Sequence, residues 1–109
     1  MHKPIAPTIR DLTTADFDAA IATGLTVVDF WAPWCGPCRA MAPQLERAAQ
    51  LRPQYNFTKV NIDEQPALAK RFSVRSIPTL AIFRNGELLG ASAGVIRAAD
   101  LVAALDGVA

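Results

Sequence analysis

The stretch Leu25-Thr-Val-Val-Asp-Phe-Trp-Ala-Pro-Trp-Cys-Gly-Pro-Cys38 decides the fold of this chain. It begins with an almost continuously apolar run, residues 25–31, which is typical of a central strand covered on both faces. It ends with Cys35 and Cys38, the only two cysteines of the chain, and residues 39–52 then follow a helical pattern. A Cys-x-x-Cys pair between a strand and a helix can alternate between a dithiol and a disulfide. The stretch therefore predicts a redox active site.

The composition is that of an ordinary globular domain. The chain has 109 residues, of which 51% are hydrophobic and 19% charged, so one domain can bury its own core. Eleven basic and ten acidic side chains nearly cancel, and the basic ones are scattered singly, which argues against nucleic-acid binding. Apolar runs are far shorter than the ~20 residues of a membrane span, so we expect no membrane association.

The first residues do not resemble a secretion signal, because Pro4 and Pro7 interrupt the place of its apolar core. We therefore expect a cytoplasmic protein, unless a targeting segment has been removed. In a reducing compartment a purely structural disulfide is uncommon. Residues 1–7 are interpreted as an N-terminal lead-in and residues 8–109 as a single domain.

Periodicity and turn residues predict an α/β fold with a mixed sheet. We expect a short edge strand at 8–10, strands at 25–31 and 55–62, and a hairpin whose strands, 79–84 and 87 onwards, flank Asn85-Gly86. Helices are expected from a capping box at 13–16 to near Gly24, and over 39–52, 65–71 and 98–105. Parallel crossovers in such a fold are right-handed.

The chain also resembles the thioredoxin family along nearly all of its length. The resemblance is carried, in order, by Asp29-Phe-Trp-Ala-Pro-Trp-Cys-Gly-Pro-Cys38, Pro43, Lys59-Val-Asn-Ile-Asp63, Ile77-Pro-Thr79, Phe83-Arg-Asn-Gly86 and Gly94. The first run is highly specific, and the later ones follow at the family's spacing. The resemblance implies the thioredoxin fold, a central mixed β-sheet flanked by four helices. Departures from common family residues are found at Arg39, at Ser76 and at Val95-Ile96.

The two cysteines are expected to have different roles. Cys35 should lie at the amino end of the following helix, where unpaired N–H groups and the helix dipole stabilise a thiolate. Pro37 suits the first helical turn, where its missing N–H costs nothing. Cys38 should lie one turn further, underneath and less exposed. We interpret Cys35 as the nucleophile and Cys38 as the thiol that resolves the mixed disulfide.

A structural disulfide and half of a zinc site are the alternatives for this pair. A disulfide that closes so short a loop removes little chain entropy. A structural zinc ion needs four ligands, and His2 is the only other side chain of the Cys or His type. The sequence therefore favours catalysis and predicts no metal site.

Asp29 is the second catalytic candidate. A carboxylate within an apolar strand is desolvated, which raises its pKa towards neutrality. Such a group can accept the proton of Cys38, through a water, when that thiol must attack the mixed disulfide. The alternative is a solvated Asp at the strand end that caps a turn. Lys59 is a possible modulator of Asp29, although a surface lysine with no such role fits the sequence nearly as well.

The resemblance also implies how clients bind. It implies that the Ile77-Pro78 peptide bond is cis and lies facing the dithiol, whereas the sequence alone favours a trans bond. A client would then lie as an extended strand held by main-chain hydrogen bonds. The expected apolar surface, called the docking rim below, comprises Trp34, Gly36, Pro37, Ile77, Pro78 and Gly94. Core packing is the alternative for Trp34, and Trp31 is assigned mainly to packing.

The inner pair Gly36-Pro37 indicates the direction of electron flow. A histidine between the cysteines would stabilise the thiolate further and make the disulfide a stronger oxidant. With no imidazole or charge there, the sequence favours a general protein-disulfide reductase.

The chain has no flavin or nicotinamide fingerprint, so we expect no bound cofactor beyond the Cys35-Cys38 couple. By resemblance, thioredoxin reductase re-reduces the pair and disulfide-containing proteins are the clients. For the oligomeric state the sequence gives no signal, and a monomer is the default expectation.

Two alternative functions stay open at this point. The first is an oxidising or isomerising thioredoxin-like domain, which an exported protein would favour. The second is a binding module that uses the docking rim while the cysteines are incidental. Loss of the cellular task on Cys35→Ser would favour catalysis over the binding module.

Overall fold

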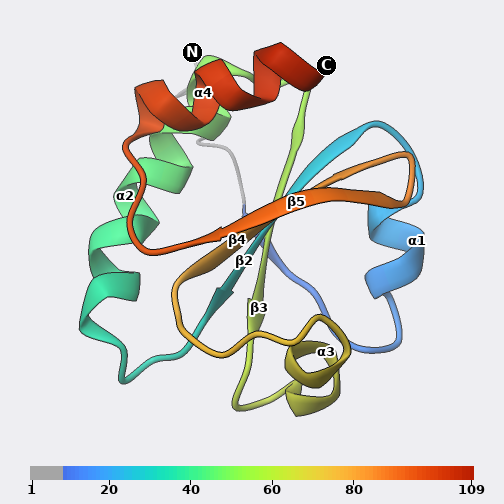
Figure 1. The fold of residues 1–109 in the computed structure, drawn as a ribbon, viewed down its shortest axis with the longest axis vertical. Helices are drawn as coiled ribbons and strands as arrows, with labels where there is room; N and C mark the ends of the chain where they lie inside the picture. Colours follow the sequence, from blue (N-terminus) through green and yellow to red (C-terminus); the bar gives the residue numbers. More distant parts are fainter. Residues whose placement is uncertain (1–8) are drawn as a thin grey trace, which may run out of the picture.

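The computed structural model describes residues 9–109, so the expected lead-in lies outside the described residues. The expected thioredoxin-type α/β fold is confirmed: a five-stranded mixed sheet is flanked by helices (Figure 1). The strands are β1 (Arg10–Asp11), β2 (Leu25–Trp31), β3 (Asn56–Asn61), β4 (Thr79–Arg84) and β5 (Glu87–Ala93). The helices are α1 (Phe17–Ile21), α2 (Gly36–Leu51), α3 (Pro66–Arg71) and α4 (Ala98–Val108).

Strand β2 lies at the centre of the sheet, whose order is β1-β3-β2-β4-β5. It pairs in parallel with β3 along one edge and antiparallel with β4 along the other. Strand β5 then pairs antiparallel with β4, as the Asn85-Gly86 turn predicts. Both turn residues have positive φ, 49° at Asn85 and 84° at Gly86, which is the backbone that a two-residue hairpin requires.

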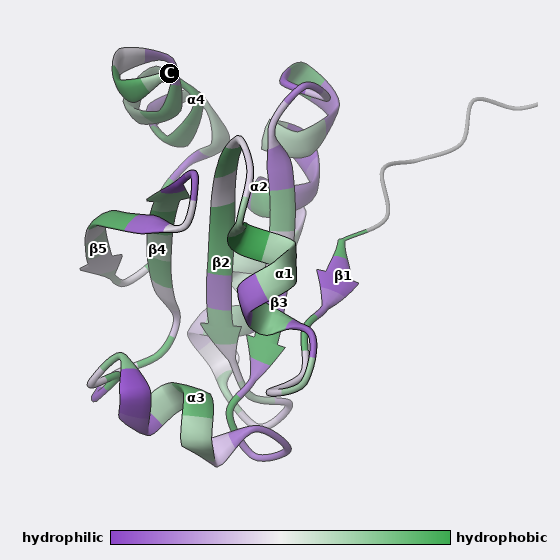
Figure 2. Cartoon of the chain, turned by 90° about the vertical axis from the view of Figure 1, so that its right-hand side faces the viewer, coloured by the Kyte–Doolittle hydropathy of each residue, from purple (hydrophilic) through white to green (hydrophobic). Residues whose placement is uncertain are grey.

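Two apolar clusters lie on the two faces of the sheet, because side chains of a strand alternate between faces. Val27 of β2 joins the cluster under α2 and α4, and Val28 and Phe30 join the cluster under α1 and α3. Figure 2 shows β2 as a mostly hydrophobic strand between β3 and β4. The second cluster is rich in aromatic rings: Phe83 lies 5.8 Å from Phe17 between ring centroids.

Several element ends differ from the sequence-based expectation. Helix α1 ends at Ile21 rather than near Gly24, because the chain there turns to meet the hairpin. The N–H of Gly24 donates to the Asn85 side chain at 2.8 Å, and its carbonyl accepts from the Asn85 N–H at 2.9 Å. Helix α4 extends past residue 105 to Val108, whose carbonyl accepts a hydrogen bond from Arg84 at 2.8 Å.

The first strand and the second helix also differ in position. Of the strand expected at 8–10, Thr8 lies outside the described residues; among residues 9–109, β1 occupies Arg10–Asp11, which pair with Thr58 and Lys59 of β3. Helix α2 begins at Gly36 instead of residue 39, because Cys35 itself is the N-cap. Among residues 9–109, no helix combines the length and the apolar character that crossing a membrane requires.

Phe83→Ala tests the role of the aromatic cluster in stability. Phe83 is only 1% exposed, so truncation leaves a cavity among the neighbouring rings and should lower the free energy of unfolding by about 3–5 kcal/mol. Urea unfolding measures this change. The control is Leu88→Ala on β5, whose side chain is 45% exposed and whose loss should change stability by less than about 1 kcal/mol. Equal effects of the two variants would contradict the assignment of Phe83 to the core.

Candidate active site

Cys35 and Cys38 are joined by a disulfide at the start of α2, with their Cα atoms 5.2 Å apart. Cys35 is the N-cap residue, with extended backbone, and the Cys38 N–H donates to its sulfur at 3.1 Å. Pro37 lies in the first turn, where its missing N–H leaves no hydrogen bond unmade. The Cys35 sulfur therefore faces the positive end of the helix dipole, an environment that stabilises a thiolate.

The two cysteines are equally buried, at 4% exposed each, so the expectation that Cys38 is the less exposed is wrong for the disulfide form. The physical reason is packing on the Cys35 side. Ala32 forms a small apolar cluster with both cysteines, and Ile77 packs against that cluster. The Cys35 sulfur also lies 3.7 Å from the carbonyl oxygen of Ile77.

The loop before β4 faces the disulfide, as the resemblance implies. The Ile77-Pro78 peptide bond is cis. The Pro78 carbonyl accepts a hydrogen bond from the Gly94 N–H at 2.8 Å, which joins two segments of the expected docking rim. Gly94 has a φ of 97°, a left-handed backbone that favours glycine. Gly36 and Pro37 are exposed and Ile77 is half-buried, but Pro78 is buried and presents little surface to a client.

Trp34 is the most exposed large apolar side chain of the described residues, at 65%. Core packing is therefore excluded for it. Its indole N–H donates to the Asp63 carboxylate at 3.0 Å, so the ring is held at the surface beside the disulfide. Asn61 in turn accepts the backbone N–H of Asp63 at 3.0 Å, which orients that carboxylate. A flat apolar ring fixed at this point suits contact with another protein.

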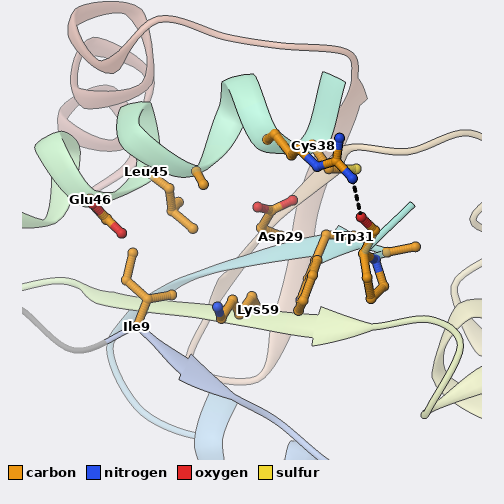
Figure 3. Close-up of a pocket in the computed structure, with 11 residues that line it drawn as sticks. Ile9, Asp29, Trp31, Cys38, Leu45, Glu46 and Lys59 are labelled. Carbon is orange, nitrogen blue, oxygen red and sulfur yellow. Dashed lines mark hydrogen bonds between the residues drawn. The ribbon is translucent and has the colours of Figure 1, made fainter. Parts of the chain in front are cut away.

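Asp29 is buried under α2, with 3% of its surface exposed. Its carboxyl points into a cavity of about 320 Å³, which Cys38 and Lys59 also line (Figure 3). Its Oδ1 atom has no hydrogen-bond partner among the described residues. A cavity of this size holds several water molecules, so a proton can pass between the carboxyl and Cys38 through solvent.

Burial is the main reason that the pKa of Asp29 rises from 3.8 to about 7. The positive charge of Lys59, its register partner on β3, lowers that pKa, and the negative charge of Asp11 raises it. Lys59 itself lies 3.8 Å from the Asp11 carboxylate and 4.9 Å from the centre of the Trp31 ring. Asp29 is thus a carboxyl whose ionisation falls near neutral pH.

Trp31 is half-buried and packs against the cluster that holds the cysteines, in agreement with its assignment to packing. Its indole N–H donates to Asp11 at 3.1 Å. Arg39 donates to the Pro33 carbonyl at 3.0 Å, which joins α2 to the turn that precedes the disulfide. Residues 9–109 hold no group of three or more His, Cys, Asp or Glu side chains suited to a metal ion.

Comparison with known proteins agrees with this geometry. The thioredoxin family profile matches residues 8–107. The chain belongs to the thioredoxin family. Thioredoxins from Staphylococcus aureus strains Mu50 and MW2 are 41% identical to it over 99 residues, which cover 90% of this chain and 95% of each relative. A solved structure from work on thiol resolving in yeast mitochondrial 1-Cys peroxiredoxin superposes with a TM-score of 0.84 and 32% identity, covering 92% of this chain and 95% of that one.

As a thioredoxin-family member with its two cysteines at disulfide distance, the protein is a protein-disulfide reductase that works by thiol–disulfide exchange. Membership implies, in general terms, a reductase that supplies electrons and clients that carry disulfides. The Cys35-Cys38 disulfide is the redox group that the structure contains.

Sequence reasoning missed two side chains of the site. Asp11 binds both Trp31 and Lys59, yet it lies in a polar N-terminal segment with no pattern of its own. Asp63 belongs to a run that resembles the family, and nothing in that run points to Trp34, 29 residues away. Both are long-range pairings of ordinary surface carboxylates, for which a single sequence carries no local signal.

Asp29 predicts how stability depends on pH. The unfolded carboxyl releases its proton near pH 3.8, whereas the folded one keeps it until about pH 7. Between these values the unfolded state binds fewer protons, so stability falls as pH rises, by on the order of 4 kcal/mol in total. Relative to Asp29→Asn, the wild-type protein should therefore lose stability between pH 4 and pH 8. Urea unfolding of both proteins across this range measures the difference, and parallel curves would contradict it.

Proposed function

We propose that Cys35 attacks the client disulfide and that Cys38 then releases the reduced client. In the first step the Cys35 thiolate forms a mixed disulfide with one client sulfur, and the other client sulfur leaves as a thiolate. In the second step the Cys38 thiolate attacks the Cys35 sulfur, which forms the Cys35–Cys38 disulfide and frees the second client thiolate. Two electrons pass from the dithiol to the client. The position of Cys35 at the N-cap of α2 is the observation that carries this assignment.

We propose that Asp29 is the general base of the second step. Its carboxylate accepts the Cys38 proton through water in the shared cavity. Cys38 thereby becomes a thiolate when it must attack the mixed disulfide. Its raised pKa supports this role, because a base works best when its pKa lies near the working pH. Lys59 modulates the base through its charge, which favours the ionised carboxylate.

Clients would dock on Trp34, Gly36, Pro37, Ile77 and Gly94. Support comes from the exposure of all of these residues except the half-buried Ile77, and from the Ile77 carbonyl beside the Cys35 sulfur. An extended client segment could pair with main-chain groups here and bind with little sequence selectivity. Pro78, which is buried, would contribute by holding Ile77 in place rather than by contact.

Residues 8–109 act as one domain and as a monomer in the cytoplasm, where a reducing pool keeps such a dithiol reduced. Gly36 and Pro37 tune the couple towards a reductant. Thioredoxin reductase supplies the electrons, and no further cofactor is bound.

A trapping experiment separates the roles of the two cysteines. Cys38→Ser leaves the attacking sulfur but removes the resolving one, so incubation with a disulfide client should give a stable mixed disulfide. Non-reducing electrophoresis detects this adduct, and dithiothreitol should release it. The matched control Cys35→Ser should give little adduct. The reverse result, with adduct on Cys35→Ser alone, would exchange the two roles.

Asp29→Asn tests the base. The neutral amide cannot accept the Cys38 proton, so the release of a trapped client at neutral pH should slow by roughly 100-fold. In the wild-type protein this rate should rise with pH through about 7, the pKa of Asp29, and the variant should lack that rise. Stopped-flow fluorescence from pH 5 to pH 9 measures both profiles. Asp100→Asn, an exposed carboxyl on α4, is the control, and identical profiles for all three proteins would remove Asp29 from the mechanism.

A further inference from the structure

Residues 94–97, called the rim loop below, connect β5 to α4 and run beside α2 (Figure 1). Every second N–H group from Gly94 to Ala98 has an acceptor elsewhere in the protein. Gly94 donates to the Pro78 carbonyl at 2.8 Å, Ile96 to the Met41 sulfur at 3.4 Å, and Ala98 to the Gln44 side-chain oxygen at 2.8 Å. Two of the three acceptors are therefore side chains of α2.

Gln44 serves α4 as a cap supplied from another helix. The first N–H groups of a helix lack partners within it, and a capping side chain usually accepts one of them. The N-cap residue Arg97 makes no such side-chain hydrogen bond. Gln44 replaces it by accepting the Ala98 N–H, and so fixes the point where the rim loop ends and α4 begins.

Met41 holds the middle of the same loop. It is completely buried, one turn of α2 after Cys38, and its sulfur accepts the Ile96 N–H. Val95, between the bound N–H groups of Gly94 and Ile96, is 48% exposed and presents its side chain to solvent beside the proposed client site. The loop thus has a fixed backbone and an outward apolar side chain.

We propose that Gln44 and Met41 are positioning residues for client binding. They lie three residues apart on one helix, whose first turn carries the two cysteines. The same helix therefore sets the place of the reacting sulfur and the place of the rim loop, so that a client in contact with the loop presents its disulfide to Cys35. This inference rests on the proposed docking of clients at the rim.

The test separates the hydrogen bond of Gln44 from its bulk. Gln44→Leu keeps most of the bulk of the side chain but leaves no hydrogen-bond acceptor, whereas Gln44→Glu keeps an acceptor. With a protein disulfide such as insulin, Gln44→Leu should raise KM by roughly threefold to tenfold at nearly unchanged kcat, and Gln44→Glu should stay close to the wild-type value. A small aromatic disulfide, which does not reach the rim loop, should be reduced equally fast by all variants.

Two matched controls accompany these variants. Gln50→Leu makes the same exchange at an exposed position of α2 and should change nothing. Val95→Asp places a charge on the rim loop itself and should raise the insulin KM. If Val95→Asp raises KM but Gln44→Leu does not, the positioning role fails and docking at the rim stands. If neither variant changes KM, both proposals fail.

Met41→Leu gives an independent check on the middle of the loop, since leucine fills similar space without the sulfur acceptor. It should raise the insulin KM and leave the small-disulfide rate unchanged. A fall in both rates together would point to a disturbed active site and would overturn the positioning role of Met41.

Discussion

Strand β2 is paired along both edges and covered on both faces, and the remainder of the site depends on this double constraint. The pairing fixes the register of β2, and the covering fixes which side chains lie on each face of the sheet. Asp29 must therefore point under α2, while its neighbours Val28 and Phe30 fill the opposite face. The strand then ends beside the turn that leads into α2. The depth of the carboxyl and the place of the sulfurs are thus consequences of one immobile strand.

The buried carboxyl shows a conflict between folding and chemistry. An apolar residue at position 29 would suit the core better, since an unpartnered carboxyl in a low-dielectric site costs free energy. The structure moderates the cost in two ways: the cavity gives the group access to solvent, and Lys59 provides a nearby positive charge. Neither the cavity nor Lys59 returns the pKa of Asp29 to the value of an exposed aspartate. The carboxyl therefore gains and loses its proton near neutral pH.

Most of the fold could be predicted from the sequence, because β2, the Asn85-Gly86 hairpin and the apolar periodicity of α2 are local patterns. The errors lie where distant contacts decide. Helix α1 ends early because Asn85 holds Gly24, and both cysteines are buried because Ile77 packs against them. Only the family resemblance predicts the cis Ile77-Pro78 bond, since the residues around a proline rarely specify its isomer. The hydrogen bond between Gln44 and Ala98 joins residues 54 positions apart, and no local sequence pattern predicts such a contact.

The strand order also has a consequence for synthesis on the ribosome. Both neighbours of β2 follow the cysteines in the chain, so Cys35 and Cys38 emerge before β3 and β4 can enclose Asp29. During that interval the thiols belong to an unfinished sheet and are accessible to oxidation. Four cysteines would allow three intramolecular connectivities, whereas two allow one. With two cysteines in the chain, any disulfide that forms within the nascent molecule is already the native one.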